Sequence, residues 1–198
     1  MKTDIYYFSG TGNSLAVAKK LAENLEHASV ISIAGAVKKK ETVSAEVLGI
    51  VCPIYMYNVP YIVVDFITQI ERADYCFLVF AGGGEPGGAL RAARNLFASH
   101  ELSLNGLFNI RMPSNYTPYG APPEELQKRL FEAAAEKVTE IAALVRGRTD
   151  HADKDETGFL KTHIHPGLLY KLGYKHIKRM DRSFLVDDTC NSCSVCEQ

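Results

Sequence analysis

The sequence predicts an α/β protein in which a five-stranded parallel sheet is covered by helices on both faces. Apolar, β-branched runs of strand length alternate with longer helical patterns through residues 1–147. The strand-like runs are continuously apolar, which is typical of strands buried on both faces. Regular alternation of such strands with helices predicts a doubly wound sandwich of three layers.

The expected elements follow one another in strand–helix order. The expected strands are residues 5–8, 30–33, 47–52, 75–81 and 107–112. The expected helices are residues 14–25, 59–70, 89–99 and 124–145. The last helix has the clearest ends, because Pro122 and Pro123 precede it, Glu124 suits its positive end and Gly147 follows it.

Composition limits the classes of protein to which the chain can belong. Its 198 residues are 46% hydrophobic, which is enough for a full core. A formal net charge of -1 predicts no general attraction to nucleic acid or anionic lipid. No apolar run approaches the ~20 residues of a membrane helix, and no signal-peptide pattern precedes the first strand. We therefore expect a cytoplasmic protein with no nucleic-acid partner and no transmembrane segment.

The character of the chain changes after the last helix, which predicts three segments. Residues 1–147 form the α/β domain, residues 148–185 a basic connector with a short helix, and residues 186–198 the start of a further module. Within the connector, residues 148–158 are polar and predict a loop. A connector that packs on the α/β domain is favoured; a docking face for an acidic partner and a membrane-surface helix are the alternatives.

A loop of small polar residues separates the first strand from the first helix. It consists of Ser9, Gly10, Thr11, Gly12, Asn13 and Ser14. Such a turn presents free backbone N–H groups at the positive end of a helix and therefore binds anions. A P-loop would carry a lysine at the end of this loop, but the first lysine after the loop is Lys19. The dinucleotide pattern G-x-G-x-x-G has Leu15 at its third glycine and lacks the acid after the second strand. A phosphomonoester held by neutral donors fits best.

Residues 9–14 closely resemble the phosphate loop of the flavodoxin family, and the resemblance extends over about residues 3–146. Two further loops follow the third and fourth strands, as they do in flavodoxins. They contain Pro53, Ile54, Tyr55, Met56, Tyr57 and Asn58, and Ala81, Gly82, Gly83, Gly84, Gly87 and Gly88. With strand order 2-1-3-4-5, all three loops meet at the carboxyl edge of the sheet. The resemblance implies a flavodoxin-like fold and an FMN site made by these residues.

The resemblance also assigns roles within the site. The chain has no tryptophan, so a tyrosine would stack on the flavin, and Tyr57 is favoured over Tyr55. A backbone carbonyl of residues 56–58 would accept the flavin N5–H. The segment 112–116 lies over the edge of the flavin or is an ordinary strand exit, and the sequence leaves both interpretations open.

The resemblance implies electron transfer by FMN without a catalytic side chain, in exchange with redox partner proteins such as a ferredoxin or a reductase. An FMN-dependent NAD(P)H or quinone oxidoreductase on the same fold is the alternative enzyme function. A phosphate-binding module without redox activity is a third hypothesis.

Cysteines are concentrated in the last residues of the chain. Cys190, Cys193 and Cys196 form C-x-x-C-x-x-C, the spacing of iron–sulfur ligands. With these residues the chain resembles the flavodoxin–ferredoxin fusion proteins of anaerobic bacteria, cut off before the fourth ligand of a 4Fe-4S cluster. We expect the natural polypeptide to continue with a cysteine at position 200 and a proline. Zinc binding and a redox-sensing thiol cluster are alternatives. Cys52 and Cys76 lie in strand patterns and are poor candidates for a fourth ligand.

Overall fold

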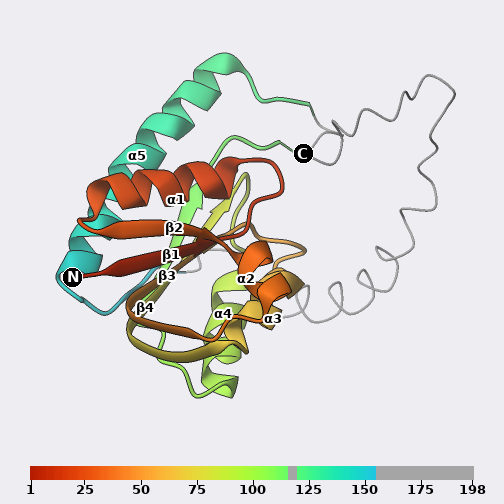
Figure 1. Ribbon diagram of the computed structural model, residues 1–198. Helices are drawn as coiled ribbons and strands as arrows, with labels where there is room; N and C mark the ends of the chain where they lie inside the picture. The colour runs from red at the N-terminus through yellow and green to blue at the C-terminus, as the bar shows by residue number, and fades with distance from the viewer. Residues whose placement is uncertain (116–119, 155–198) are drawn as a thin grey trace, which may run out of the picture.

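The computed structural model describes residues 1–115 and 120–154, which form a three-layer α/β sandwich (Figure 1). Its sheet has six parallel strands in the order β2-β1-β3-β4-β5-β6. The predicted flavodoxin-like fold with order 2-1-3-4-5 is confirmed, with one strand added at the edge. The strands are β1 (Thr3–Tyr7), β2 (Ala28–Ser32), β3 (Val43–Cys52), β4 (Ile70–Gly82), β5 (Gly106–Arg111) and β6 (His151–Ala152). The helices are α1 (Asn13–Asn24), α2 (Ile33–Lys39), α3 (Tyr61–Ile67), α4 (Ala89–Ser99) and α5 (Glu124–Arg146).

The prediction of a loop through residues 148–158 is wrong at β6. His151 N–H donates to the Asn105 carbonyl at 2.9 Å, and Asp153 N–H donates to the Leu107 carbonyl at 2.8 Å. The His151 ring also stacks on Phe108, with ring centroids 5.3 Å apart. A two-residue strand of this kind has no apolar run, so its sequence carries no strand pattern; backbone pairing to β5 forms it.

Helix α2 occupies a connection for which the sequence predicted no helix. It begins at a cap in which the Ser32 hydroxyl accepts from Gly35 N–H at 3.4 Å. It ends after Lys38 and Lys39, whose charges suit the negative end of a helix. The helix is short and contains a glycine, which lowers intrinsic helix propensity. Packing of Ile33 and Ala36 against the sheet supplies the stability that the local sequence lacks.

The predicted ends of β3, β4 and α3 also need correction. Both strands begin earlier than expected, at Val43 and Ile70, and α3 ends at Ile67 rather than at residue 70. The added strand residues include exposed polar side chains, such as Ser44 and Glu71, which hydrogen-bond to each other at 3.2 Å. Apolar runs therefore mark only the buried parts of these strands.

Two hydrophobic cores lie on the two faces of the sheet, as Figure 1 shows from the positions of the helices. Helices α1 and α5 cover one face, and α2, α3 and α4 cover the other. Strand β4 serves both cores in alternation, with Phe77 and Val79 on the first face and Leu78 and Phe80 on the second. Burial on both faces is thus confirmed for the central strands. The edge strand β2 is only partly buried. Among the helices of the described residues, none has the length and apolarity needed to cross a bilayer.

A close approach at the centre of the sheet restricts one position to glycine. Gly49 of β3 pairs with Phe77 of β4. A Cβ at Gly49 would lie 2.4 Å from Cζ of the fully buried Phe77 ring. The ring therefore occupies the space that a larger residue at position 49 would need.

We predict that Gly49→Ala lowers the free energy of unfolding by about 1–3 kcal/mol, because the buried Phe77 ring must shift to accommodate the methyl group. Gly35→Ala is the matched control, since its Cβ would meet nothing closer than 3.8 Å. It should raise the free energy of unfolding by about 0.5–1 kcal/mol, because alanine favours a helix over glycine. Chemical denaturation of both variants measures the difference, and equal effects would contradict the packing argument.

Candidate functional site

An open cleft lies at the carboxyl edge of the sheet, where the loops after β1, β3, β4 and β5 meet. Its volume is about 440 Å³. Most of the residues that the sequence assigned to a cofactor site line it. The lining consists of Ser9, Gly10, Thr11, Asn13, Ser14, Pro53, Ile54, Tyr55, Ala81, Gly82, Gly83, Gly84, Ser114 and Asn115. The remaining assigned residues, which the lining does not include, are Gly12, Met56, Tyr57, Asn58, Gly87 and Gly88.

The loop of residues 9–14 has the geometry of an anion site. Gly12 adopts the left-handed conformation, φ 101°, at the position before α1, which glycine tolerates without strain. Its N–H donates to the Ser9 hydroxyl at 3.0 Å and thereby holds the turn. No side chain caps α1 and no acid lies in its first turn. An anion at the positive end of this helix would therefore meet the N–H groups without competition from a carboxylate of the first turn.

Two side-chain hydrogen bonds join this loop to the exit of β5. The Asn13 amide donates to the Pro113 carbonyl at 2.9 Å, and the Asn115 amide donates to the Thr11 hydroxyl. They make Ser114 and Asn115 part of the cleft. Both were absent from the sequence-based list of site residues, although their place directly after a parallel strand marks the same edge of the sheet.

The segment 112–116, for which the sequence left two interpretations open, divides between core and cleft. Met112 is buried in the core beneath α1 and α5. Ser114 and Asn115 line the cleft. Tyr116 lies outside the described residues.

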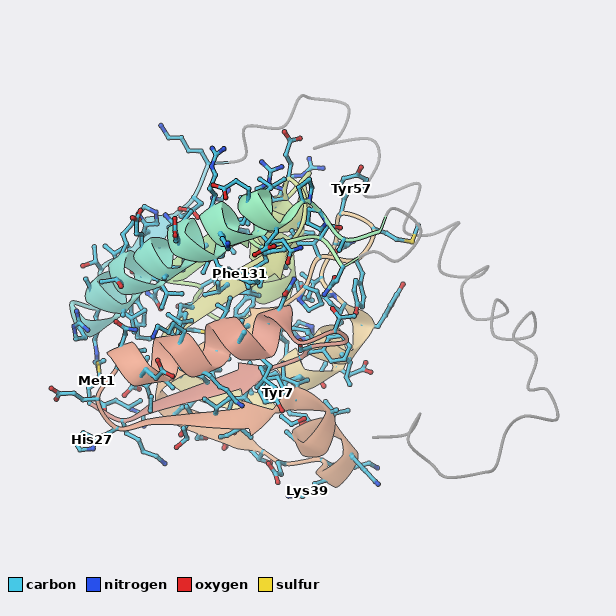
Figure 2. The ribbon with its side chains drawn as sticks, turned by 90° about the horizontal axis from the view of Figure 1, so that it is seen from above. Met1, Tyr7, His27, Lys39, Tyr57 and Phe131 are labelled. Atoms are coloured by element: carbon cyan, nitrogen blue, oxygen red, sulfur yellow. The ribbon has the colours of Figure 1, made fainter. Side chains whose placement is uncertain are left out.

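The loop after β3 is a tight turn at residues 55–58. Tyr55 and Asn58 exchange backbone hydrogen bonds of 3.1 and 3.0 Å, and Met56 and Tyr57 both have positive φ, 50° and 59°. These are the features of a type I′ turn, which glycine and asparagine usually form. Tyr57 packs against Gly87, where a Cβ would lie 2.3 Å from its ring. Figure 2 shows Tyr57 at the periphery of the described fold.

Tyr55 rather than Tyr57 is the tyrosine that lines the cleft. Its ring meets Phe8 edge-on, with ring centroids 6.1 Å apart, and 45% of the residue is exposed. A Cβ at Gly10 would lie 2.9 Å from the Tyr55 hydroxyl, so this side chain reaches across to the first loop. Partial burial raises the pKa of the Tyr55 phenol, with a smaller effect of Cys52. The hydroxyl therefore stays protonated as a neutral donor.

Glycines in the loop after β4 serve two different purposes. Gly83 lies against the backbone of Ser114, where a Cβ would be 2.7 Å from Cα. This contact closes the cleft between the β4 and β5 exits. Gly87 and Gly88 have φ of 48° and 92°, and Gly88 caps α4. These two form the turn into the helix, which explains why they carry the glycine pattern without lining the cleft.

Within residues 1–115 and 120–154, no charged side chain lines the cleft, and the polar groups of the lining are hydroxyls, amides and backbone. Among the described residues, no cluster of His, Cys, Asp and Glu could hold a metal ion. Cys52 and Cys76 are buried, and burial raises the pKa of both thiols far above the ordinary value. Their burial agrees with the strand positions that the sequence predicted. Cys190, Cys193 and Cys196 lie outside the described residues.

No family model matches the chain, and no curated protein matches it. Solved structures do match the chain. The crystal structure of azoreductase AzrA has a TM-score of 0.50 and 11% identity, over 72% of this chain and 99% of that one. Flavodoxin from Megasphaera elsdenii has a TM-score of 0.39 and 22% identity, over 68% of this chain and 98% of that one. An FMN-dependent NADH-azoreductase from Bacillus anthracis, solved with FMN, has a TM-score of 0.46 and 11% identity, over 72% of this chain and 98% of that one. At such identities, the likeness to azoreductase AzrA shows a shared fold alone.

Proposed function

We propose that the protein binds FMN in the cleft and transfers electrons through it. The observation that carries this proposal is the uncharged cleft of about 440 Å³ in which the phosphate-type loop, Tyr55 and the glycine loop after β4 come together. A planar, mostly apolar ring system with a phosphate at one end fits such a lining. FMN, when bound, supplies the redox chemistry, and the protein supplies binding, orientation and electrostatics.

The phosphate end of the ligand is held by the loop of residues 9–14. The backbone N–H groups at the start of α1 and the Thr11 hydroxyl serve as donors. Asn13 and Asn115 hold the loop in place through their bonds to the β5 exit and to Thr11. Because these donors are already positioned, little conformational entropy is lost on binding.

The ring end of the ligand lies between Tyr55 and the loop of residues 81–84. The Tyr55 ring offers a stacking face, and the glycine backbone offers hydrogen bonds to a heterocyclic edge. The proposal includes that a backbone carbonyl of residues 56–58 would accept a hydrogen bond from the flavin N5–H. The Asn58 carbonyl already accepts from Tyr55 N–H, which favours the other carbonyls of this turn.

Electron transfer is favoured over substrate turnover by the composition of the lining. Among the described residues, the lining contains no His, Cys, Asp, Glu or Lys, so the Tyr55 phenol is its one candidate for a general acid or base. The NAD(P)H or quinone oxidoreductase function stays the alternative. We also propose a cytoplasmic location and redox partners such as a ferredoxin or a reductase.

The proposal includes a ferredoxin-type module after the basic connector of residues 148–185. Its support is the C-x-x-C-x-x-C pattern of Cys190, Cys193 and Cys196, whose three thiolates suit three corners of a 4Fe-4S cluster. In such a protein, residues 161–182 would set the distance between cluster and flavin.

We predict that Thr11→Asp weakens FMN binding by about 2–4 kcal/mol, roughly thirtyfold or more, because a carboxylate then faces the phosphate. Thr139→Asp is the control, since Thr139 is exposed on α5 outside the cleft. Isothermal titration calorimetry with FMN measures both. Normal affinity of Thr11→Asp would show that the phosphate does not lie in this loop.

We predict that Tyr55→Ala weakens FMN binding by about 1–3 kcal/mol through loss of ring stacking. Tyr57→Ala should leave the affinity within about threefold of the wild-type value, because Tyr57 does not line the cleft. Quenching of flavin fluorescence reports both affinities. A larger effect at Tyr57 would support the choice made from the sequence.

We predict that the flavin absorbance of the loaded protein bleaches in two separate one-electron stages during anaerobic reductive titration. NADH or NADPH alone should not bleach it rapidly, because an electron carrier needs no site for hydride transfer. Rapid bleaching by either nucleotide would favour the oxidoreductase function instead.

We predict that the 198-residue chain binds FMN but carries little or no iron, since three thiolates leave one corner of a 4Fe-4S cluster open. A longer chain should carry stoichiometric iron and sulfide if it continues with a cysteine at position 200, a proline and about fifty further residues of ferredoxin type. This length is the one that the family resemblance implies. Iron and sulfide assays compare the two. Stoichiometric iron in the shorter chain would contradict the prediction.

A further inference from the structure

An apolar groove lies between α1 and α5, on the face of the sheet that these two helices cover. Its volume is about 200 Å³. The residues that line it belong to α1, to α5 or to the position directly after β5, and they are Ala16, Val17, Lys20, Met112, Phe131, Ala134, Ala135 and Val138. The short side chains of the alanines leave space between the two packed helices. Among the described residues of this lining, only Lys20 is charged, and its ammonium group pairs with Glu23 at 2.7 Å. The groove therefore offers room to apolar side chains.

Phe131 adds an apolar surface that the core does not cover. The residue is 50% exposed, and Figure 2 shows it on α5, on the side toward α1. Ala135 follows one helical turn later and is also exposed. Residues four apart lie on the same face of a helix, so the two form one apolar strip along the groove. An exposed aromatic ring that continues into an apolar groove marks a surface suited to binding another chain segment.

Carboxylates flank this strip on α5. Glu132 and Glu136 are exposed, and neither forms an ion pair in the part of the chain that the structure describes. The lysines of the same helix, Lys128 and Lys137, pair with other acidic residues. Because residues 124–140 contain five glutamates and three Lys or Arg, this part of the helix keeps an excess of negative charge. A segment that combines apolar and basic side chains is therefore complementary to the surface.

The chain leaves the described residues beside the middle of α5. The Asp153 carboxylate lies 3.2 Å from the Lys137 ammonium group, and Lys137 directly precedes Val138 of the groove. Lys154 is the next residue and the last one described. An extended chain covers up to about 3.3–3.6 Å per residue, so about ten residues suffice to cross a helix of about 10–12 Å diameter. The following part of the connector is therefore within reach of the groove.

The connector has the composition that this surface requires. Leu168, Leu169 and Leu172 have the spacing of one helical face. Basic residues stand among and after them, namely Lys171, Lys175, Lys178 and Arg179. The sequence of residues 161–180 contains no Asp or Glu. Apolar and basic side chains thus occur together in the part of the chain that can reach the groove.

We propose that residues 166–180 of the connector occupy the groove between α1 and α5. The three leucines enter the groove and cover Phe131, and the Lys and Arg side chains lie near the flanking carboxylates of α5. Met112 of the lining stands two residues before Ser114 of the cleft, so the connector is held beside the proposed flavin site. This inference concerns a different surface and goes beyond the proposed function.

Hydrogen–deuterium exchange of the complete 198-residue chain without flavin, measured by mass spectrometry, tests the proposal. In the wild-type protein, amides of residues 166–180 should exchange at least about tenfold more slowly than those of an unstructured chain. Ala135→Lys puts a long charged side chain into the groove and should remove this protection. Ala143→Lys is the matched control, since Ala143 is exposed on the same helix and does not line the groove. It should change the exchange of residues 166–180 less than about twofold. Equal exchange of β4 in all three proteins shows that each of them folds.

A second pair of variants tests the charges. Glu136→Lys should speed the exchange of residues 166–180 about two- to fivefold, the effect expected of one exposed ion pair. Glu101→Lys is its control, since Glu101 is exposed after α4, on the opposite face of the sheet. It should leave the exchange of residues 166–180 unchanged. High salt should abolish the difference between the two variants, because it screens exposed charges.

Three results would overturn the inference. Exchange of residues 166–180 at the rate of an unstructured chain in the wild-type protein would show that the groove does not hold them. Slow exchange that Ala135→Lys leaves unchanged would place them elsewhere. A wild-type dimer that Ala135→Lys converts to a monomer, measured by light scattering, would assign the groove to a second copy of the chain. Because no flavin is present in these experiments, their failure leaves the proposed function intact, and the titrations with FMN test that function separately.

Discussion

Parallel pairing of β3 with β4 is the constraint on which the rest of the structure depends. The two strands pair from Val43 with Ile70 to Cys52 with Phe80, in the middle of the sheet. Alternate residues of each strand enter the two opposite cores, so a slip of one residue would exchange the two faces. Because parallel strands all end at one edge, the same pairing brings the loops after β3 and β4 beside those of β1 and β5.

The cleft at that edge offers donors that are placed by the fold rather than charged. They are backbone N–H groups at the start of α1, hydroxyls and amides, and no lysine or arginine of the described residues lines the cleft. Neutral donors leave an anion only partly neutralised, so their arrangement must be ordered before the ligand arrives. The bonds from Asn13 to Pro113 and from Asn115 to Thr11 supply that order, because they tie the phosphate-type loop to the end of β5.

The sequence by itself determined the alternation of strands and helices, the three loops of the cleft and the burial of Cys52 and Cys76. These features follow from local patterns, since continuous apolar runs mark central strands and glycine marks turns, whereas the predicted sheet order followed from the family resemblance. The sequence missed β6 and α2, whose stability comes from pairing and packing with residues distant in the chain.

Within the site, the sequence favoured Tyr57, whereas the turn of residues 55–58 places Tyr55 in the cleft. Which of two neighbouring tyrosines faces the cleft depends on how separate strand exits approach each other. Only the tertiary structure decides that, because no local pattern encodes the distance between Gly83 and Ser114 or between Thr11 and Asn115.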